Sequence, residues 1–123
     1  DMNELIESSD VVSVHLPLID GATRGIITAE NLDHLRPGTL FINTARSEVI
    51  EPGALLARLQ RGDIPAGLDV FDHEPLKSGD AICQVPGIVL WRTDGAFKEL
   101  TRQMVECVRA FLAGGEYNVV VHE

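Results

Sequence analysis

The sequence is poor in basic residues. It has 10 Lys and Arg against 19 Asp and Glu, which gives the 123 residues a formal net charge of −9. Binding to nucleic acid or to an anionic bilayer requires clustered Lys and Arg that neutralise phosphates. The composition therefore argues against both kinds of partner. Because 45% of the residues are hydrophobic, the chain favours one acidic globular domain with a core of modest size.

Cysteines and long apolar runs are also scarce. Cys83 and Cys107 each occur singly, which argues against a disulfide framework or a metal knuckle and favours reduced, buried thiols. No run approaches the roughly 18 apolar residues that span a bilayer. The first residues, Asp1 to Glu4, lack the basic start of an export signal. We therefore expect a cytoplasmic protein.

Short apolar runs rich in β-branched residues alternate with helical patterns along the chain. The expected strands cover residues 10–16, 39–43, 66–70 and 88–91. The expected helices cover residues 2–9, 28–36, 51–61 and 97–112. Strands that are apolar on both faces and alternate with helices favour an α/β fold, with about four parallel strands and helices on each side. Residues 72–87 are expected to form a loop and residues 118–121 an extended tail.

Local signals mark where these helices begin. Thr28 is a good N-cap residue, although Asn31 stands where a capping box would prefer Glu or Gln. Pro52 is expected in the first turn of the next helix, because its fixed φ suits that position. The last helix carries apolar residues at helical spacing, among them Met104, so we expect this stripe to pack in the core.

Three segments occur in an order and at separations typical of one enzyme family. Residues 9–18 read SDVVSVHLPL, residues 36–46 read RPGTLFINTAR and residues 67–75 read GLDVFDHEP. Together they resemble the D-isomer-specific 2-hydroxyacid dehydrogenases over nearly the whole chain. The resemblance implies a partial Rossmann-like, three-layer domain, an NAD or NADP cofactor and a small 2-hydroxy or 2-keto acid substrate.

The same family also shows what this sequence lacks. No G-x-G-x-x-G motif occurs, although such a turn lets backbone N–H groups and a helix N-terminus approach the pyrophosphate of the cofactor. Residues 1–123 therefore resemble a single truncated domain, the C-terminal half of an NAD(P)-binding Rossmann-type domain, without the family's separate substrate-side domain. We expect these residues alone to lack dehydrogenase activity. Whether this chain is an enzyme stays open, because it resembles one but lacks half of the cofactor site.

The resemblance assigns substrate binding and proton transfer to named positions. Arg46 matches the arginine of the family's Asn-x-x-Arg motif, and the planar guanidinium fork pairs with a carboxylate through two bonds. Glu74 matches the acidic residue that holds a catalytic histidine and raises its pKa. Thr93 occupies the position of that histidine, and its hydroxyl cannot exchange a proton near neutral pH as an imidazole does. No histidine lies between His73 and His122, so we expect the proton donor to be lost.

The resemblance also marks a cofactor side. The matching residues are His15, Pro17, Thr23, Thr44, Ala45 and Asp69. The first three fall on the adenine and ribose side, and Thr44 and Ala45 match the stretch beside the nicotinamide. Asp69 matches the residue that accepts a hydrogen bond from the nicotinamide carboxamide in relatives. Ser47 replaces the family's usual glycine, and its side chain could crowd the cofactor.

Two hypotheses of different classes follow. The first is a fragment of an NAD-dependent D-2-hydroxyacid dehydrogenase, an oxidoreductase that acts on the CH–OH group of 2-hydroxy acids. The alternative is a non-catalytic binding or interaction module derived from that fold, because the phosphate-binding turn and the histidine are missing. In either case the open, β-branched edge at residues 11–14 invites pairing with another copy. We expect a homodimer or a larger assembly, or else a longer natural polypeptide of which these residues are a part.

Overall fold

The computed structural model describes residues 1–90, 94–115 and 117, and it divides into two compact units. One unit comprises Asp1–Trp91 and the other Arg92–Glu123. The predicted strand residue Trp91 and the predicted extended tail at 118–121 lie outside the described residues. Among the described residues, no helix is long and apolar enough to cross a membrane.

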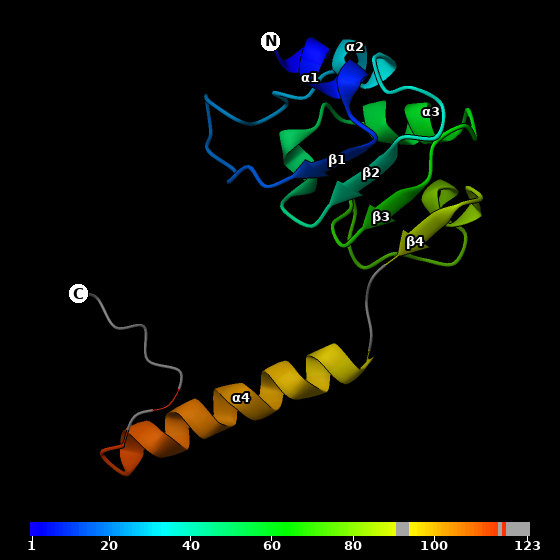
Figure 1. Ribbon diagram of the computed structural model, residues 1–123. Helices are drawn as coiled ribbons and strands as arrows, with labels where there is room; N and C mark the ends of the chain where they lie inside the picture. The colour runs from blue at the N-terminus through cyan, green and yellow to red at the C-terminus, as the bar shows by residue number, and fades with distance from the viewer. Residues whose placement is uncertain (91–93, 116, 118–123) are drawn as a thin grey trace. The chain divides into compact units, whose positions relative to one another are not determined.

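A four-stranded parallel sheet forms one layer of the first unit (Figure 1). Its strands are β1 (Val11–Val14), β2 (Leu40–Asn43), β3 (Ala66–Leu68) and β4 (Ile88–Leu90), in that spatial order. The prediction of an α/β fold with about four parallel strands is therefore confirmed. The order also places β1 and β4 at the two edges of the sheet.

Helices α1 (Met2–Ser8), α2 (Ala29–Asp33) and α3 (Ala54–Leu59) gather on one face of this sheet (Figure 1). The strands lie in the sheet in the same order as in the sequence. Because connections between parallel strands are right-handed, successive connections then cross on the same face of the sheet. In agreement, α2 contacts both α1 and α3. Two short 3-10 helices occur in the loops: η1 (Ser47–Val49) and η2 (Ala81–Gln84), the latter within the segment predicted to be loop alone.

The core of the first unit lies between the sheet and these helices. Alternate side chains of each strand point to this face, and Phe41 of β2 and Leu68 of β3 belong to the same buried cluster as Leu59 of α3. The other row of side chains is more open, because Val11 of β1 is 55% exposed and Val89 of β4 is 61% exposed. Among the described residues of this unit, helical cover is thus found on one face, so the helices predicted for the other side of the sheet, and with them the third layer, are not present in this unit.

The start of α3 differs from the sequence prediction. Pro52 does not lie in its first turn, because the helix begins at Ala54 with Gly53 as its N-cap residue. Gly53 adopts φ 77°, a left-handed conformation that glycine reaches without a steric penalty because it has no Cβ. The change of direction at Gly53 therefore separates Pro52 from the helix.

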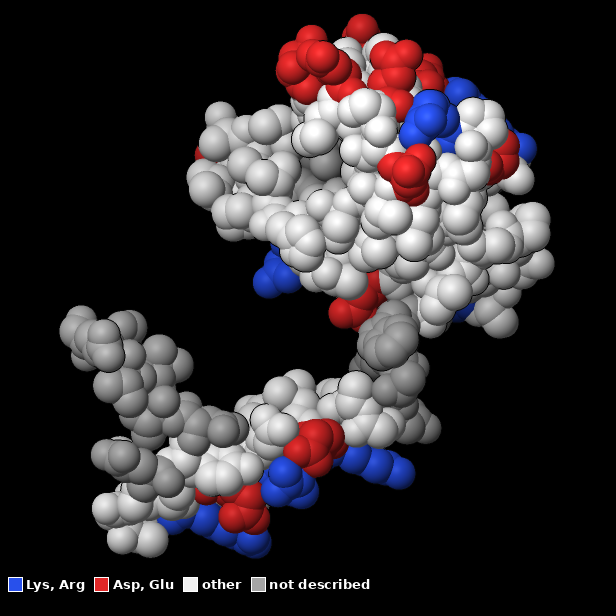
Figure 2. All heavy atoms as spheres, viewed as in Figure 1, with Lys and Arg blue, Asp and Glu red and all other residues white. Residues whose placement is uncertain are grey.

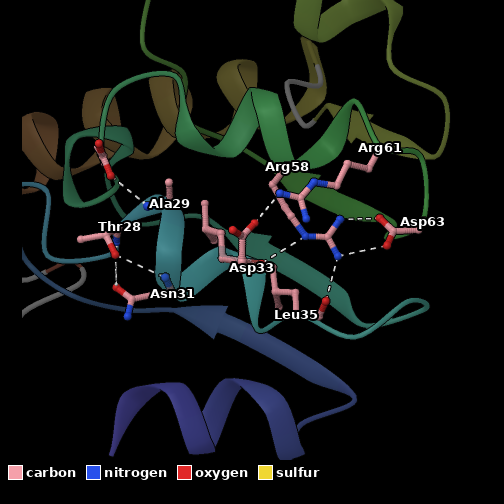
Figure 3. Close-up of polar contacts among 10 residues, drawn as sticks. Thr28, Ala29, Asn31, Asp33, Leu35, Arg58, Arg61 and Asp63 are labelled. Carbon is pink, nitrogen blue, oxygen red and sulfur yellow. Dashed lines mark hydrogen bonds and ion pairs between the residues drawn. The ribbon is translucent and has the colours of Figure 1, made fainter.

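The predicted cap of α2 forms at Thr28. Asn31 Oδ1 accepts from the Thr28 backbone N–H at 2.8 Å, and the Asn31 N–H donates to Thr28 Oγ1 at 3.3 Å (Figure 3). The asparagine therefore completes a capping box in the role more usual for Glu or Gln.

The second unit contains helix α4 (Asp94–Leu112), which begins three residues before its predicted start at 97. Gly114 follows the helix at φ 71°, and the Gly115 N–H donates to the Ala110 carbonyl at 2.8 Å, which ends it. The predicted burial of the apolar stripe is not met within this unit, where Met104 is 62% exposed.

The two cysteines are free and partly exposed. Cys83 lies on η2 and Cys107 on α4. The prediction of buried thiols is wrong for both, since each is partly exposed.

Candidate functional site

The carboxyl ends of β1 and β2 border a hollow of about 500 Å³. Its lining residues are His15, Leu16, Pro17, Leu18, Thr44, Ala45 and Arg46. Because neighbouring parallel strands end at the same edge of a sheet, segments 15–18 and 44–46 meet although they are far apart in the sequence. Five residues that the sequence singled out therefore share this hollow: His15, Pro17, Thr44, Ala45 and Arg46.

Arg46 supplies a cation to this hollow. The residue is exposed and extended, at φ −145° and ψ 141°, immediately before η1. Its Nη1 donates to the carbonyl of Ala45 at 2.7 Å. Since a guanidinium has several N–H donors in a rigid fork, this bond orients the group and leaves it able to bind a carboxylate.

The segment after Arg46 turns away from this hollow. The Ser47 hydroxyl donates to Glu48 Oε2 at 3.2 Å, and Ser47 lines a second, larger hollow. Ser47 is thus absent from the lining of the hollow that Arg46 borders, and the crowding of a cofactor by its side chain stays a prediction. A hydrogen bond from the backbone N–H of Glu48, aided by the Ser47 hydroxyl and by the charges of Arg24 and Arg46, lowers the pKa of the Glu48 carboxyl.

His15 is exposed beside the smaller hollow. Its Nε2 lies 2.9 Å from Ser13 Oγ, two residues earlier on the chain. Alternate residues of an extended strand point to the same side, which brings these two side chains together. The hydrogen bond orients the imidazole at the edge of the hollow.

Thr23 serves the loop that carries Pro17. Its Oγ1 donates to the Pro17 carbonyl at 2.5 Å and accepts from the Ile19 N–H at 2.8 Å. Thr23 does not line the smaller hollow. The hydroxyl therefore shapes one wall of the hollow by holding the loop after β1.

Asn43 is a functional candidate to which the sequence patterns assigned no role of its own, although it is the asparagine of the Asn-x-x-Arg motif. It is the last residue of β2, it is buried, and its side chain bonds the Arg46 segment. Its carbonyl accepts from the Asp69 N–H at 3.0 Å, which ties the end of β2 to exposed Asp69 beyond β3. The sequence does carry a signal for this residue, since an amide directly follows the apolar run of residues 40–42. A buried amide needs specific hydrogen-bond partners.

Glu74 lies apart from these residues. It is exposed, and its Oε1 accepts from the Phe71 N–H at 3.2 Å. Glu74 lines neither of the two hollows, so the structure does not bring it together with Arg46 in either. Thr93, at the position of the family's histidine, lies outside the described residues.

The larger hollow has a volume of about 910 Å³ and lies between the segment after β2, α3 and the loop after β3. Its apolar wall includes Leu55, Leu56, Val70, Phe71, Leu76 and Ile82. Asp72, His73 and Asp80 also line it. Among the described residues, however, no group of three or more His, Cys, Asp or Glu could hold a metal ion.

The surface charge is uneven in the first unit. Acidic side chains gather over α1 and α2 (Figure 2). They include Asp1, Glu4, Glu7, Glu30 and Asp33. Such a cluster repels anions, so an anionic ligand would be favoured near Arg46 and away from these two helices.

A dinucleotide would find only part of its site in the described residues. The smaller hollow offers an apolar wall, the exposed imidazole of His15 and the guanidinium of Arg46. No described segment has the strand, glycine-rich turn and helix that would bring backbone N–H groups to a pyrophosphate. The residues therefore fit one side of a nicotinamide cofactor and do not fit its phosphates.

Known proteins are similar to this chain in both sequence and structure. Residues 1–91 match the family described as D-isomer specific 2-hydroxyacid dehydrogenase, NAD binding domain. The glycerate dehydrogenase of Methylorubrum extorquens is 36% identical over 128 residues, covering 98% of this chain and 40% of that protein. The glyoxylate/hydroxypyruvate reductase B of Shigella boydii is 39% identical over 90 residues, covering 72% of this chain and 28% of that protein.

A solved structure extends this similarity to the fold. The D-isomer specific 2-hydroxyacid dehydrogenase from Xanthobacter autotrophicus Py2, in complex with NADPH and MES, matches with a TM-score of 0.64 at 34% identity. The match covers 98% of this chain and 51% of that one. The chain thus spans 40% and 28% of the two curated relatives and about half of the crystallised one. This chain belongs to the family of the D-isomer specific 2-hydroxyacid dehydrogenases, as its three sequence segments predicted, and residues 1–91 correspond to the family's NAD-binding domain.

Proposed function

We propose that this chain is part of an NAD-dependent D-2-hydroxyacid dehydrogenase, an oxidoreductase that interconverts a small 2-hydroxy acid and its 2-keto acid. The observation that supports this function best is the hollow at the ends of β1 and β2, where Arg46 lies beside Thr44, Ala45 and His15. The names of two relatives refer to glycerate, glyoxylate and hydroxypyruvate. We therefore propose a short 2-hydroxy or 2-keto acid as substrate.

Arg46 is the residue proposed to bind the substrate carboxylate. Its guanidinium is exposed at the hollow and oriented by the bond to the Ala45 carbonyl. A guanidinium fork binds a carboxylate through two parallel hydrogen bonds, which would also orient the neighbouring carbonyl group of a 2-keto acid.

Glu74 is proposed to hold the proton donor in an intact site. In this chain that pairing is incomplete, because Thr93 stands at the position of the histidine and a threonine hydroxyl cannot serve as a general acid or base near neutral pH. The Glu74 carboxylate instead accepts a hydrogen bond from the Phe71 backbone. We therefore propose that the 123 residues alone do not catalyse turnover.

NAD or NADP, when bound, supplies or accepts the hydride. His15, Pro17, Thr44 and Ala45 are proposed to contact it from the wall of the smaller hollow, and Asp69 to accept a hydrogen bond from its carboxamide. Thr23 is proposed to contribute by holding the Pro17 loop, since its hydroxyl already has two backbone partners. We also propose that residues 1–123 form the C-terminal half of the cofactor domain.

Calorimetric titration with oxamate, an analogue of a short 2-keto acid, tests the role of Arg46. The wild-type chain should bind oxamate saturably, and Arg46→Met should weaken binding by about tenfold or more because the bidentate pair is lost. Arg46→Lys should be intermediate, because an ammonium lacks the planar fork. Arg61→Met is the matched control, since Arg61 is an exposed arginine paired with Asp33. Equal affinity of wild type and Arg46→Met would refute the assignment.

A non-catalytic binding module is the second candidate, and one observation favours it. Glu74 lines neither hollow, so the described residues do not assemble the acid–base half of a dehydrogenase site. Titration with NAD distinguishes the candidates: the dehydrogenase part predicts weak, saturable binding that Ala45→Arg would block, whereas a module that has lost the cofactor predicts no heat of binding. Adding NADH and hydroxypyruvate should give no absorbance change in either case.

We further propose that the chain self-associates through β1 and acts in the cytoplasm. β1 is an edge strand with an exposed Val11 and no charged residue between Val11 and Val14. An uncharged β-branched edge favours pairing with another strand. The free thiols of Cys83 and Cys107 fit a reducing compartment.

A further inference from the structure

Asn43 is a polar residue in an otherwise apolar row of the sheet. It is 1% exposed, and the strand register places it between Val14 of β1 and Leu68 of β3. Burying an amide among such neighbours costs free energy unless hydrogen bonds satisfy its oxygen and nitrogen. The partners of the amide therefore indicate what the residue does.

Both ends of the Asn43 amide bind the segment that contains Arg46. Oδ1 accepts from the Ala45 N–H at 3.0 Å, and Nδ2 donates to the Arg46 carbonyl at 3.1 Å. Local bonds of this kind from an asparagine side chain fix the path of the backbone where a strand ends. Asn43 thus holds the main chain just before and just after the Arg46 side chain.

The Arg46 guanidinium is attached to the same segment. Its Nη1 donates to the Ala45 carbonyl at 2.7 Å, so the side chain folds back on a residue whose position Asn43 determines. The Asn43 carbonyl also accepts from the Asp69 N–H. One buried residue therefore links the cation at the hollow to Asp69 beyond the neighbouring strand.

We propose that Asn43 is a positioning residue for Arg46: its buried amide fixes the loop after β2 so that the guanidinium is held at the hollow in a geometry suited to a carboxylate. The carboxylate in this inference rests on the function proposed above. The competing explanation is that Asn43 only completes the core. In that case an apolar residue of similar size would serve equally well.

Two variants separate these explanations. Asn43→Leu fills a similar volume between apolar neighbours but offers no partner to Ala45 or Arg46. Asn43→Ser is smaller, yet its hydroxyl can still accept from the Ala45 N–H and should restore part of the effect.

Thr39→Val is the matched control. Thr39 is also buried, at 2% exposed, and it precedes the opposite end of β2, where its hydroxyl donates to the Ser9 carbonyl at 3.3 Å. Loss of this hydrogen bond should lower the stability of the fold without changing the position of Arg46, because distant sites contribute independently. Thermal unfolding measures the loss of stability that all three variants are expected to share.

Two readouts follow the loop itself. Amide hydrogen exchange at Ala45, measured by NMR, should become about tenfold faster in Asn43→Leu relative to the core amides, because its acceptor is removed. Oxamate affinity should fall by about tenfold in the same variant. Asn43→Ser should lie between this variant and wild type, and Thr39→Val should stay within about twofold of wild type in both.

Unchanged Ala45 exchange in Asn43→Leu would overturn the proposal, as would an unchanged oxamate affinity. If the wild-type chain binds no oxamate, the proposed function fails separately. The Ala45 exchange rate and the NMR signal of the Arg46 guanidinium then decide whether Asn43 positions Arg46. If Asn43→Leu does not fold, Asn43→Ser is compared with Thr39→Val by the same measurements, and equal behaviour of these two variants would overturn the proposal.

Discussion

The guanidinium of Arg58 is paired with the carboxylate of Asp63, and the arginine is buried to 3% exposure (Figure 3). Its Nε also donates to the Leu32 carbonyl at 3.1 Å, and its Nη2 donates to the Leu35 carbonyl at 2.8 Å. The last carbonyls of a helix have no partner within the helix. Arg58 of α3 therefore satisfies the end of α2 and joins the two helices above the sheet.

Arg58→Met should destabilise the first unit strongly. The change removes the cation paired with Asp63 and the side-chain donor of the Leu35 carbonyl, and it leaves the Leu32 carbonyl only its backbone partners. We expect the free energy of unfolding to fall by about 3 kcal/mol. Urea unfolding followed by circular dichroism measures this loss. Arg61→Met, which removes an exposed pair with Asp33, should cost less than about 1 kcal/mol. Equal losses in the two variants would contradict the importance of the buried position.

Acid should weaken the fold through Asp63. The hydrogen bond from Arg58 lowers the pKa of the Asp63 carboxyl below its ordinary value. The folded state therefore resists protonation, so this stabilisation is fully present above the ordinary aspartate pKa of about 4 and is lost as the pH falls through the lower folded value. Between wild type and Asp63→Asn, the difference in urea midpoint should shrink as the pH is lowered below about 4. A difference that is constant with pH would contradict this linkage.

Replacing Asn31 with Glu should not stabilise α2, although the residue preferences of a capping box favour Glu at this position. Asn31 Nδ2 donates to Asn3 Oδ1 at 2.6 Å and so ties α2 to α1. A glutamate has no such donor, and we expect Asn31→Glu to lower the free energy of unfolding by about 1 kcal/mol. Thermal unfolding in the wild-type and Asn3→Ala backgrounds checks the cause. The loss should be smaller when Asn3 is already absent, and an equal loss in both backgrounds would exclude this bond as its source.

Val11→Lys should reduce self-association. Val11 is exposed on the edge strand β1, and a lysine there disfavours pairing with the edge of another copy. Light scattering across a concentration series should show a larger mass for the wild type than for the variant. Val89→Lys is the control, because Val89 is similarly exposed on the opposite edge strand. A wild type that stays monomeric at high concentration would contradict the proposed assembly.

Local patterns were sufficient to predict most elements of this fold. The β-branched run at 11–14 and the apolar run at 40–42 specify strands through alternating burial, and Thr28 marks the start of α2 by its side-chain chemistry. The start of α3 could not be predicted in the same way. Pro52 and Gly53 are both compatible with a helix start, and the left-handed φ of Gly53 decided between them.

The candidate site was predicted in part for a similar reason. The family motifs identify Arg46, Thr44 and His15 one by one, but they do not state which of them meet. The parallel register of β1 and β2 brings their ends to one edge, where these residues share a hollow. The same motifs assign Glu74 and Arg46 to one catalytic site. In the structure, however, Glu74 does not line the hollow that Arg46 borders, nor the larger one.

The sequence by itself determined the order of strands and helices, the acidic charge and the membership in the dehydrogenase family, because periodicity, caps and short motifs are local properties of a chain. Only the tertiary structure decided that segments 15–18 and 44–46 line one hollow, that Ser47 faces another, and that the Asn43 amide binds the Arg46 segment. These relationships depend on strand register and on which buried polar atoms find partners. Both are set by the packing of residues that are distant in the sequence.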